Sequence, residues 1–568
     1  DSSFTRIRGD SLGGKGRGIA FMRSLLVRYN LEKKYPDINI TVPSTVVIGT
    51  LEFDRFVSDN NLIEFANRED LSDNELAKAF LEGQICDELK DNLAKVLQHF
   101  KSPLAVRSSS LLEDSQSRPF AGIYSTYMLP NSHKSEAVRL SQLCQAIKLV
   151  YASVFFKESR AYLKSTSSKI EEEKMAVIIQ EVVGNDYGGR VYPTFSGVAQ
   201  SYNFYPVGHQ TFEDGIVSVA AGLGKTVVGG EKVLRFSPSY PGIIPEFSSP
   251  ELILENSQRE LYVLDTSKSN FILSEKDDST LMKPNIDDIK KDGTLEFIAS
   301  TYDRNDRMIR DSMSDEGPAL ITFSGVLKYD AFPLAPLVKD ILDIGKRGMG
   351  CPIEIEFAVN FDKENKKIPT FAILQLRPLV PSHEHCEIIW DENTNRENVF
   401  IHSDKALGNG VVKSIRNIVY VPPETFDPSK TIEIADEIGK MNEILLTSSL
   451  PYILIGPGRW GTEDRWLGIP VKWSQISGVR VMVETALEDF DIKPSQGTHF
   501  FHNITSRGIG YINVPFKSKD FFIDWKWLDK QKTVNELKFV KHAQLSHPLK
   551  IKFDGRSGSA LIVKPGKS

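Results

Sequence analysis

Two short segments near residue 360 alternate polar and apolar side chains. In the first, Glu354 and Glu356 stand between large apolar residues, and in the second, Gln375 and Arg377 stand beside leucines. Alternate side chains of a β-strand point to the same face, so each segment is expected to be a strand with one polar and one apolar face. The polar residues 362–367 between them predict a hairpin loop.

This hairpin is expected to gather four polar groups on one solvent-facing patch. If the strands pair symmetrically about the loop, Glu356 faces Gln375 and Glu354 faces Arg377, while the apolar faces pack on the core. Mg²⁺ takes oxygen ligands, usually one or two carboxylates plus substrate phosphates, and the planar fork of Arg matches phosphoryl oxygens. A Mg²⁺-phosphate site and an ordinary amphipathic hairpin with a solvated charged face explain the alternation equally well.

Two upstream segments could also approach phosphate. Residues 12–16 form a glycine-rich stretch that carries Lys15, although a flexible loop explains the same composition. Residues 105–110 place Arg107 at the end of a predicted strand, followed by serine hydroxyls able to donate to phosphate. The loop from 114 to 122 could then close over a nucleotide as a lid.

A further glycine-rich segment resembles a phosphate-binding loop but lacks its first glycine. Residues 222–226 read GLGKT after an apolar run, yet Val219 stands where the GxxxxGK[ST] pattern needs glycine. The sequence therefore argues against a P-loop NTPase. The glycines are instead expected to bring the backbone close to a ligand or to another strand.

Two dense motifs and a metal-like trio lie after residue 380. Residues 455–462 place glycines around an arginine, a pattern that could form an anion-binding nest. Residues 494–503 contain His499, which could accept a phosphoryl group or act as a base; tight turns with a satisfied histidine are the simpler interpretation of both motifs. A zinc site is disfavoured because a fourth ligand is lacking from the trio of His383, His385 and Cys386.

The chain is expected to combine strands and helices in three units. Strand-like apolar runs alternate with a helical stretch over residues 136–164, whereas residues 238–320 are polar and read as an insertion. All six tryptophans follow residue 380, where two prolines end an apolar strand. We therefore predict an α+β or α/β fold with units at 1–170, 171–380 and 381–568, the last being a Trp-rich α/β domain without an assigned role.

Bulk composition excludes several classes of protein. The net charge of −6 argues against nucleic acid as the main partner, and the lack of an apolar run of about 20 residues argues against a membrane span. Four scattered cysteines without a CxxC pair suit a reducing, cytoplasmic compartment. Because the chain starts with Asp1 rather than Met, we suspect a fragment of a longer protein, and an oligomer is compatible with the sequence.

The order of these motifs resembles the phosphoenolpyruvate synthase and pyruvate phosphate dikinase family over the first 380 residues. Each matching segment is common by itself, but ten in the right order are not. They are GGKG at 13–16, AVRSSS at 105–110, ED at 113–114, FAG at 120–122, ASVF at 152–155, QEVV at 180–183, SGV at 196–198, GLG at 222–224, IEF at 355–357 and LQLRP at 374–378. Residues 381–568 are not matched.

The resemblance implies an ATP-grasp fold in two lobes that binds ATP and Mg²⁺. The residues in contact with ATP would be Lys15, Arg107, Gln180, Glu181, Val183, Gln375 and Arg377. The metal ligands would be Glu354, Glu356 and Gln375, although the family more often has Asp at position 354. Catalysis would rest on Arg107, Glu356 and Arg377, because phosphoryl transfer needs positioning and charge neutralisation more than covalent chemistry.

The phosphoryl acceptor stays open. The family phosphorylates a histidine in a TSHAA-like motif on a swivelling domain and then serves pyruvate in a barrel domain with a catalytic Cys; neither motif occurs in this sequence. We therefore expect a dikinase-like phosphotransferase whose acceptor is a small molecule or a phosphohistidine domain, in this chain or another. A non-catalytic ATP-binding regulatory module and an ATP-grasp carboxylate ligase also fit the sequence.

Overall fold

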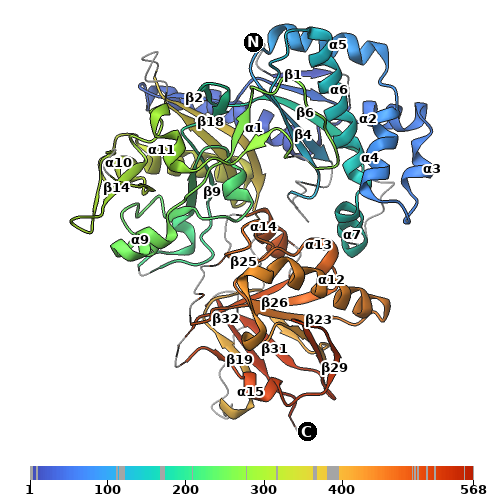
Figure 1. The fold of residues 1–568 in the computed structure, drawn as a ribbon, viewed down its shortest axis with the longest axis vertical. Helices are drawn as coiled ribbons and strands as arrows, with labels where there is room; N and C mark the ends of the chain where they lie inside the picture. The colour runs from blue at the N-terminus through green and yellow to red at the C-terminus, as the bar shows by residue number, and fades with distance from the viewer. Residues whose placement is uncertain are drawn as a thin grey trace.

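Three groups of sheets and helices make up the protein, and Figure 1 shows the C-terminal group below the other two. The architecture is mixed α+β, in agreement with the fold class expected from the sequence. The computed structural model describes residues 4–7, 10–110, 113, 122–166, 173–207, 209–276, 278–314, 317–361, 368–379, 396–488, 490, 494, 498–506, 509–516, 518, 520–554 and 557–566.

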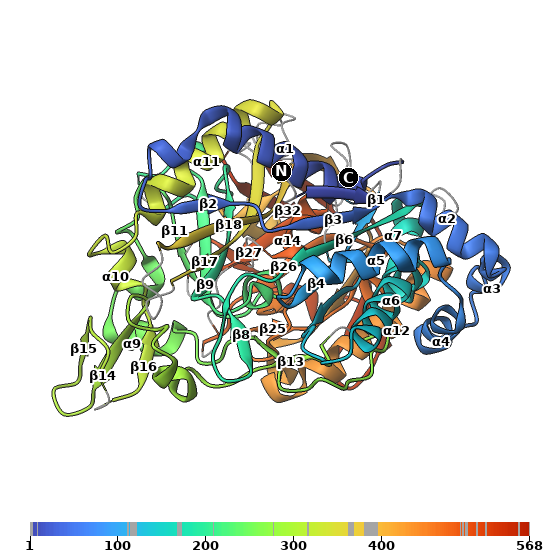
Figure 2. The same ribbon diagram turned by 90° about the horizontal axis from the view of Figure 1, so that it is seen from above.

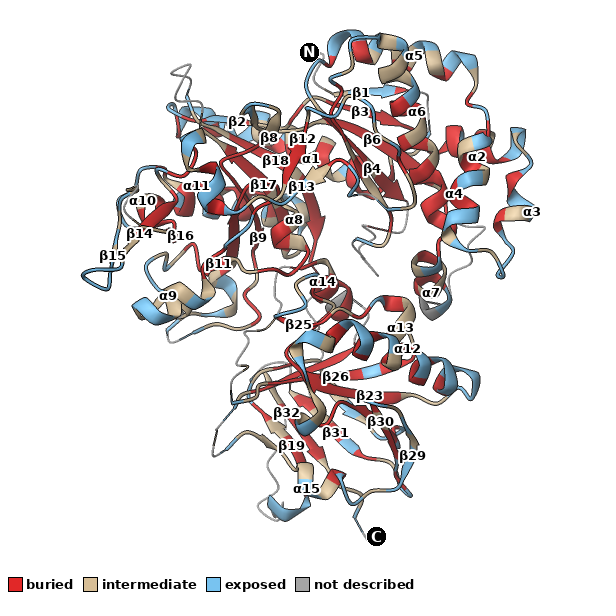
Figure 3. Ribbon diagram, viewed as in Figure 1, coloured by how far each residue is buried: buried red, intermediate tan, exposed pale blue. Residues whose placement is uncertain are grey.

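The first sheet has five strands covered by helices on its outer side. Its strand order is β1 (Phe4–Ile7), β3 (Thr45–Ile48), β6 (Met175–Glu181), β4 (Leu104–Ser110) and β5 (Thr126–Leu129). Apolar side chains of these strands form one core with the helices α2 (Thr50–Asp59), α4 (Asp73–Glu82), α5 (Asp87–His99) and α6 (Glu136–Ala152). Figure 3 shows the strands buried and the outer faces of these helices exposed.

The second sheet has six strands and carries the predicted hairpin at its centre. Its order is β11 (Leu234–Phe236), β10 (Ile216–Ala221), β9 (Phe195–Gln200), β17 (Ile353–Asn360), β18 (Thr370–Pro378) and β2 (Asn39–Thr41). Helix α11 (Leu334–Met349) packs on β17, and α1 (Gly13–Tyr29) lies beside α11 and contacts both β18 and β4 (Figure 2). Helix α1 therefore joins the two sheets.

The two sheets exchange strands across the predicted division at residue 170. β6 follows that division in the chain yet completes the first sheet between β3 and β4, whereas β2 precedes it and joins the second sheet beside β18. Long-range strand pairing, rather than sequence order, therefore defines the two units. Sequence periodicity carries no information on which strands pair over such distances.

The predicted hairpin forms with the expected register. Glu354 pairs with Arg377 and Glu356 pairs with Gln375, and the strands shift by one residue after Glu356. The polar face, however, is buried instead of solvent-facing: Glu354, Gln375 and Arg377 are at most 1% exposed. This burial cannot be predicted from the local pattern because the covering residues come from distant segments. The loop over 362–367 lies outside the described residues.

Three local expectations differ from the structure. The helical stretch 136–164 breaks after Ala152, and a 3-10 turn leads to α7 (Lys157–Thr166). The glycine-rich stretch 12–16 is the first turn of α1 instead of a loop. The polar segment 238–320 is folded, with β12 (Val263–Asp265), β14 (Ala299–Asp303) and β16 (Ala319–Ile321), and apolar residues from it pack into the core of the second sheet.

The C-terminal region stacks two sheets and covers one of them with helices. The seven-stranded sheet includes the parallel strands β22 (Asn417–Tyr420), β23 (Tyr452–Pro457), β26 (Val479–Thr485) and β27 (Gly510–Val514). The helices α12 (Thr431–Thr447), α13 (Trp473–Ile476) and α14 (His499–Ser506) lie on the side that faces the first two sheets (Figure 1). All described strands of both C-terminal sheets fall within residues 399–563.

Among the helices in the described part of the chain, none is both long and apolar enough to cross a bilayer.

Candidate functional site

Arg107 links the two N-terminal sheets at the centre of the site. Its Nη2 donates to Gln375 Oε1 at 2.7 Å and to Glu356 Oε2 at 3.1 Å, while its Nη1 donates to the Leu374 carbonyl at 3.2 Å and to Gln180 Oε1 at 3.4 Å. Arg107 lies in the middle of β4 instead of at a strand end, because the strand continues through the serines that follow. One guanidinium thus gathers groups from β6, β17 and β18.

A cavity of about 260 Å³ opens beside Arg107 between the two sheets. Of the residues predicted to contact ATP or metal, Arg107, Glu356 and the run from Gln180 to Val183 line it. The cavity falls slightly below the roughly 300–1,000 Å³ of typical ligand pockets.

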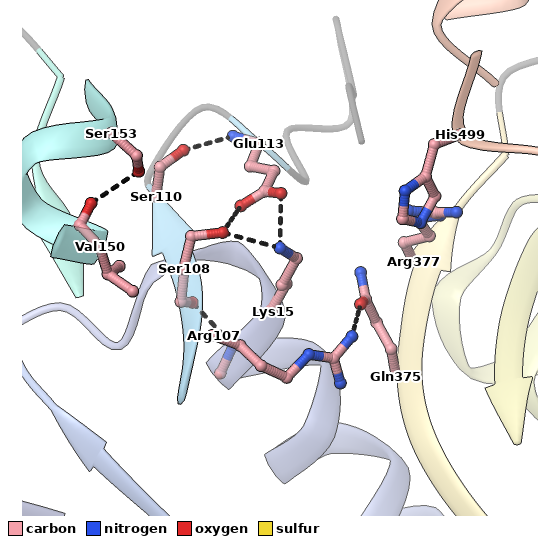
Figure 4. A network of polar contacts seen from close by, with 12 residues as sticks. Lys15, Arg107, Ser108, Ser110, Glu113, Val150, Ser153, Gln375, Arg377 and His499 are labelled. Carbon is pink, nitrogen blue, oxygen red and sulfur yellow. Dashed lines mark hydrogen bonds and ion pairs between the residues drawn. The ribbon is translucent and has the colours of Figure 1, made fainter. Parts of the chain in front are cut away.

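Lys15 does not line this cavity. Its Nζ lies 2.5 Å from Glu113 Oε1 and 3.0 Å from Ser108 Oγ, and the side chain is 7% exposed (Figure 4). A buried ammonium is stable only with such a partner. Glu113, which the sequence analysis matched only as part of a motif, therefore fixes Lys15 in the first turn of α1.

The three serines after Arg107 are fully buried and take part in internal hydrogen bonds. Ser108 donates to Glu113, Ser109 donates to the Leu12 carbonyl at 2.7 Å, and Ser110 accepts from the Glu113 backbone N–H. Their hydroxyls therefore support the Lys15 turn and are not presented to a phosphate, in contrast to the expectation from the sequence.

Glu354 and Arg377 form a buried ion pair behind the cavity. Arg377 Nε donates to Glu354 Oε1 at 2.7 Å, and Gln200 Nε2 donates to the other carboxylate oxygen at 2.6 Å. Both oxygens of Glu354 are therefore engaged, and neither Glu354 nor Arg377 lines the cavity. Of the two predicted carboxylate ligands for a metal, this structure presents Glu356 to the cavity.

The carboxylate of Glu356 lies among two arginines and His499. Burial by itself would raise its pKa, but the hydrogen bond from His499 and the charges of Arg107 and Arg377 hold that pKa well below its usual range. Glu356 is consequently a carboxylate at neutral pH. Arg377 Nη2 lies 3.8 Å from its Oε1.

The groups around Glu356 fit a Mg²⁺-phosphate ligand. The buried Nε2 of Gln375 has no hydrogen-bond acceptor within the described part of the chain, and such a donor suits a phosphate oxygen. No group of three or more His, Cys, Asp or Glu side chains is gathered among the described residues. A divalent cation at Glu356 would therefore take most of its oxygens from Gln375, water and the phosphates, as Mg²⁺ commonly does.

Two residues of the C-terminal region complete the cavity wall. His499, the first residue of α14, places its Nε2 3.3 Å from Glu356 Oε1, and Glu463 lines the cavity from the loop after β24 (Arg459–Trp460). Burial lowers the pKa of His499, and the charge of Arg377 acts in the same direction. The sequence analysis singled out His499 but missed Glu463, for which no local pattern exists.

Gly229 and Gly230, which follow the GLGKT segment, contact the region of the second glycine motif. Arg459 Nη1 donates to the Gly230 carbonyl at 2.9 Å, Thr462 Oγ1 donates to the same carbonyl at 3.1 Å, and the Glu463 N–H donates to the Gly229 carbonyl at 2.9 Å. Arg459 is buried, so it anchors the C-terminal region and does not form an exposed anion nest. The carbonyls of Gly229 and Gly230 thus accept hydrogen bonds from the C-terminal region, and the approach of residues 222–226 to a ligand stays a prediction.

Other predicted features lie outside the described residues. They are most of the lid over 114–122 and the trio His383, His385 and Cys386.

Comparison with known proteins agrees with this geometry. Residues 9–398 match the family described as pyruvate phosphate dikinase, AMP/ATP-binding domain. The chain belongs to this family. The matched range contains all strands of the first two sheets except β1, and every cavity residue except those contributed by the C-terminal region.

A curated relative of the chain is also a phosphotransferase by name. The uncharacterized phosphotransferase YvkC of Bacillus subtilis (strain 168) is 30% identical over 247 residues, which are 42% of this chain. The aligned part spans 27% of that relative. Family and relative together support an ATP-binding protein of the phosphotransferase type.

Proposed function

We propose that this chain is an ATP-dependent, dikinase-like phosphotransferase with an ATP-grasp cleft between its first two sheets. The observation that carries the proposal is the contact of Arg107 with both Glu356 and Gln375 at the edge of a cavity. A cation on one lobe and an anion-amide pair on the other are the equipment that a Mg²⁺-bound triphosphate needs. The membership of residues 9–398 in an AMP/ATP-binding family supports the same assignment.

Each side of the cavity has a proposed role. The run from Gln180 to Val183 would hold the adenine, and Arg107 would bind the phosphate oxygens with its fork. Glu356 and Gln375 would hold Mg²⁺, which when bound neutralises charge on the phosphates. Arg377 would orient Glu356 through their 3.8 Å contact, with Glu354 fixing the guanidinium from behind.

Lys15 has two proposed states. In this structure Glu113 and Ser108 hold its ammonium. A nucleotide phosphate would compete with Glu113 for Lys15, so we propose that Lys15 contacts ATP only after this ion pair opens.

The proposal is tested by incubating the full chain with Mg²⁺ and ATP labelled at the β or γ position. Consumption of ATP with transfer of label to protein or to an added small molecule supports it. Tight nucleotide binding without any consumption, unchanged in Glu356→Gln, would instead indicate a regulatory module. ADP together with an acyl-phosphate trapped by hydroxylamine would indicate a carboxylate ligase and contradict the proposal.

A further inference from the structure

His499 reaches the cavity from a different part of the fold than the groups it meets. It starts α14 in the C-terminal region, whereas Glu356 lies on β17, 143 residues earlier in the chain. Its Nε2 lies 3.3 Å from Glu356 Oε1, and its side chain is 28% exposed, so the imidazole is accessible from the cavity. Figure 4 shows His499 beside Arg377, opposite Arg107 and Lys15.

The backbone around His499 leaves room for the imidazole and little else. Gly122, with φ of +66°, lies against the ring, and a Cβ at that position would come within 2.4 Å of His499 Nδ1. The Nδ1 edge is therefore occupied by backbone, and the Nε2 edge faces Glu356. The ring is oriented with Nε2 toward the place where Arg107 would bind phosphates and where Glu356 and Gln375 would hold Mg²⁺.

Other cavity residues with nucleophilic side chains are less suited to attack. Ser196 is buried and donates to the Gly222 carbonyl at 2.8 Å. Lys225 lies over the ring of Tyr262, with its Nζ 5.5 Å from the ring centroid. Of these three side chains, only that of His499 contacts Glu356.

We propose that His499 is the phosphoryl acceptor, so that the C-terminal region of the chain is phosphorylated in cis. This inference rests on the proposed function and specifies its acceptor. The contact between His499 and Glu356 opens first, because a phosphoryl group does not fit in a 3.3 Å separation. The small cavity agrees with such an opening.

The transfer step balances without any further reactant. In the reactive tautomer the proton is on Nδ1, and the Nε2 lone pair faces the terminal phosphorus of ATP. The bond from Nε2 to phosphorus forms while the bond from that phosphorus to the bridging oxygen breaks. ADP leaves with the electron pair, and the Nδ1 proton is released to water. The product is phosphohistidine on the C-terminal region, which a second acceptor would then discharge.

The test measures two quantities in the full chain: the phosphoryl label transferred to the protein and the exchange of labelled ADP into ATP. Wild-type protein with Mg²⁺ and γ-labelled ATP is expected to gain acid-labile, alkali-stable label in the peptide that contains His499. It is also expected to exchange labelled ADP into ATP, because transfer to His499 is reversible once ADP is bound. The exchange assay detects the intermediate even where water removes the label quickly.

A matched pair of variants separates the acceptor from its surroundings. His499→Gln keeps an amide donor near Glu356 but forms no phosphohistidine, so label and exchange should fall at least 100-fold while the dissociation constant for ATP stays within threefold. His547→Asn, at an exposed position of the same region, should retain both at the wild-type level. Unchanged thermal unfolding would show that His499→Gln is folded.

The outcomes distinguish the inference from the proposed function. If wild-type protein consumes ATP but His499→Gln keeps label and exchange, or the label maps elsewhere, the inference is overturned and the proposed function stands. If the His499→Gln variant consumes ATP faster than wild type, and neither protein forms phosphohistidine, His499 acts as a gate and the inference also falls. If wild-type protein neither consumes ATP nor exchanges ADP, both fail.

Discussion

Arg107 on β4 and Glu356 on β17 are 249 residues apart in the chain, yet their side chains meet with 3.1 Å between Nη2 and Oε2. Both are largely buried, with 12% and 13% of their side chains exposed. This ion pair spans the two N-terminal sheets at the cavity edge. A Mg²⁺-bound triphosphate in the cavity, as proposed above, would replace this ion pair with contacts of its own.

Replacing Glu356 by Gln should abolish turnover without removing the side chain. The change keeps the shape but deletes the negative charge that Arg107, Arg377 and His499 surround, so Mg²⁺ would lose its anionic ligand. We expect ATP consumption to fall by about 100-fold or more, measured as ADP release with saturating Mg²⁺. Turnover within threefold of wild type, in protein with unchanged circular dichroism, would remove Glu356 from the site.

Breaking the Glu354–Arg377 pair should affect stability more than a typical surface change. Glu354→Leu leaves the buried guanidinium of Arg377 without its main partner, and such a loss costs about 3–5 kcal/mol. Urea unfolding followed by circular dichroism measures it. The double variant Glu354→Leu, Arg377→Met should lose less stability than the sum of the two single variants. Strict additivity would contradict the pairing.

The C-terminal region should become less stable as pH rises from about 4.5 to about 7. Glu484 is buried, accepts from the Trp460 N–H at 3.0 Å and from the Tyr511 hydroxyl, and burial raises its pKa to about 7. The folded state thus binds a proton between about pH 4.5 and 7 that the unfolded state has released, so stability falls as pH increases across that range. The maximal loss is about 3 kcal/mol.

Glu484→Gln isolates this effect. The amide cannot ionise, so the thermal midpoint of the variant should vary less between pH 5 and pH 8 than that of wild type. Identical pH profiles for the two proteins would show that Glu484 is ionised in the folded state throughout this range.

Docking of the C-terminal region should depend on the hydroxyl of Thr462. Thr462 Oγ1 donates to the Gly230 carbonyl, next to the Arg459 contact with the same atom. Thr462→Val keeps the shape and removes the donor, which should weaken docking by about 1 kcal/mol. Faster amide hydrogen exchange in α14 and at Gly230 would report this, and Thr462→Ser should behave like wild type. Equal exchange rates in the Val and Ser variants would exclude the contact as a determinant of docking.

Gly122→Ala should displace the imidazole of His499 while leaving the nucleotide contacts in place. The added Cβ meets Nδ1 at 2.4 Å, and the φ of +66° already disfavours any side chain. We expect phosphohistidine formation to fall by about tenfold or more, with ATP affinity changed by less than about threefold. Wild-type labelling of this variant would mean that the ring does not depend on Gly122 for its position.

Sequence alone predicted the parts of the site that depend on local pattern. The alternation of polar and apolar residues predicted both strands of the hairpin. It also predicted that Glu354 faces Arg377 and Glu356 faces Gln375, because an antiparallel pair joined by a short loop has few alternative registers. The run from Gln180 to Val183 lines the cavity, and its contact with ATP stays a prediction. Placing Arg107 near Glu356 likewise came from resemblance, since spacing says nothing about contacts between distant strands.

Only the tertiary structure decided which polar groups face the cavity. Burial of the hairpin face commits Glu354 to Arg377 and leaves Glu356 facing the cavity, and Glu113 withdraws Lys15 into the first turn of α1. A buried charge must find a partner, and which partner it finds depends on the packing of segments hundreds of residues apart. For the same reason, the approach of His499 to Glu356 could not be read from either motif by itself.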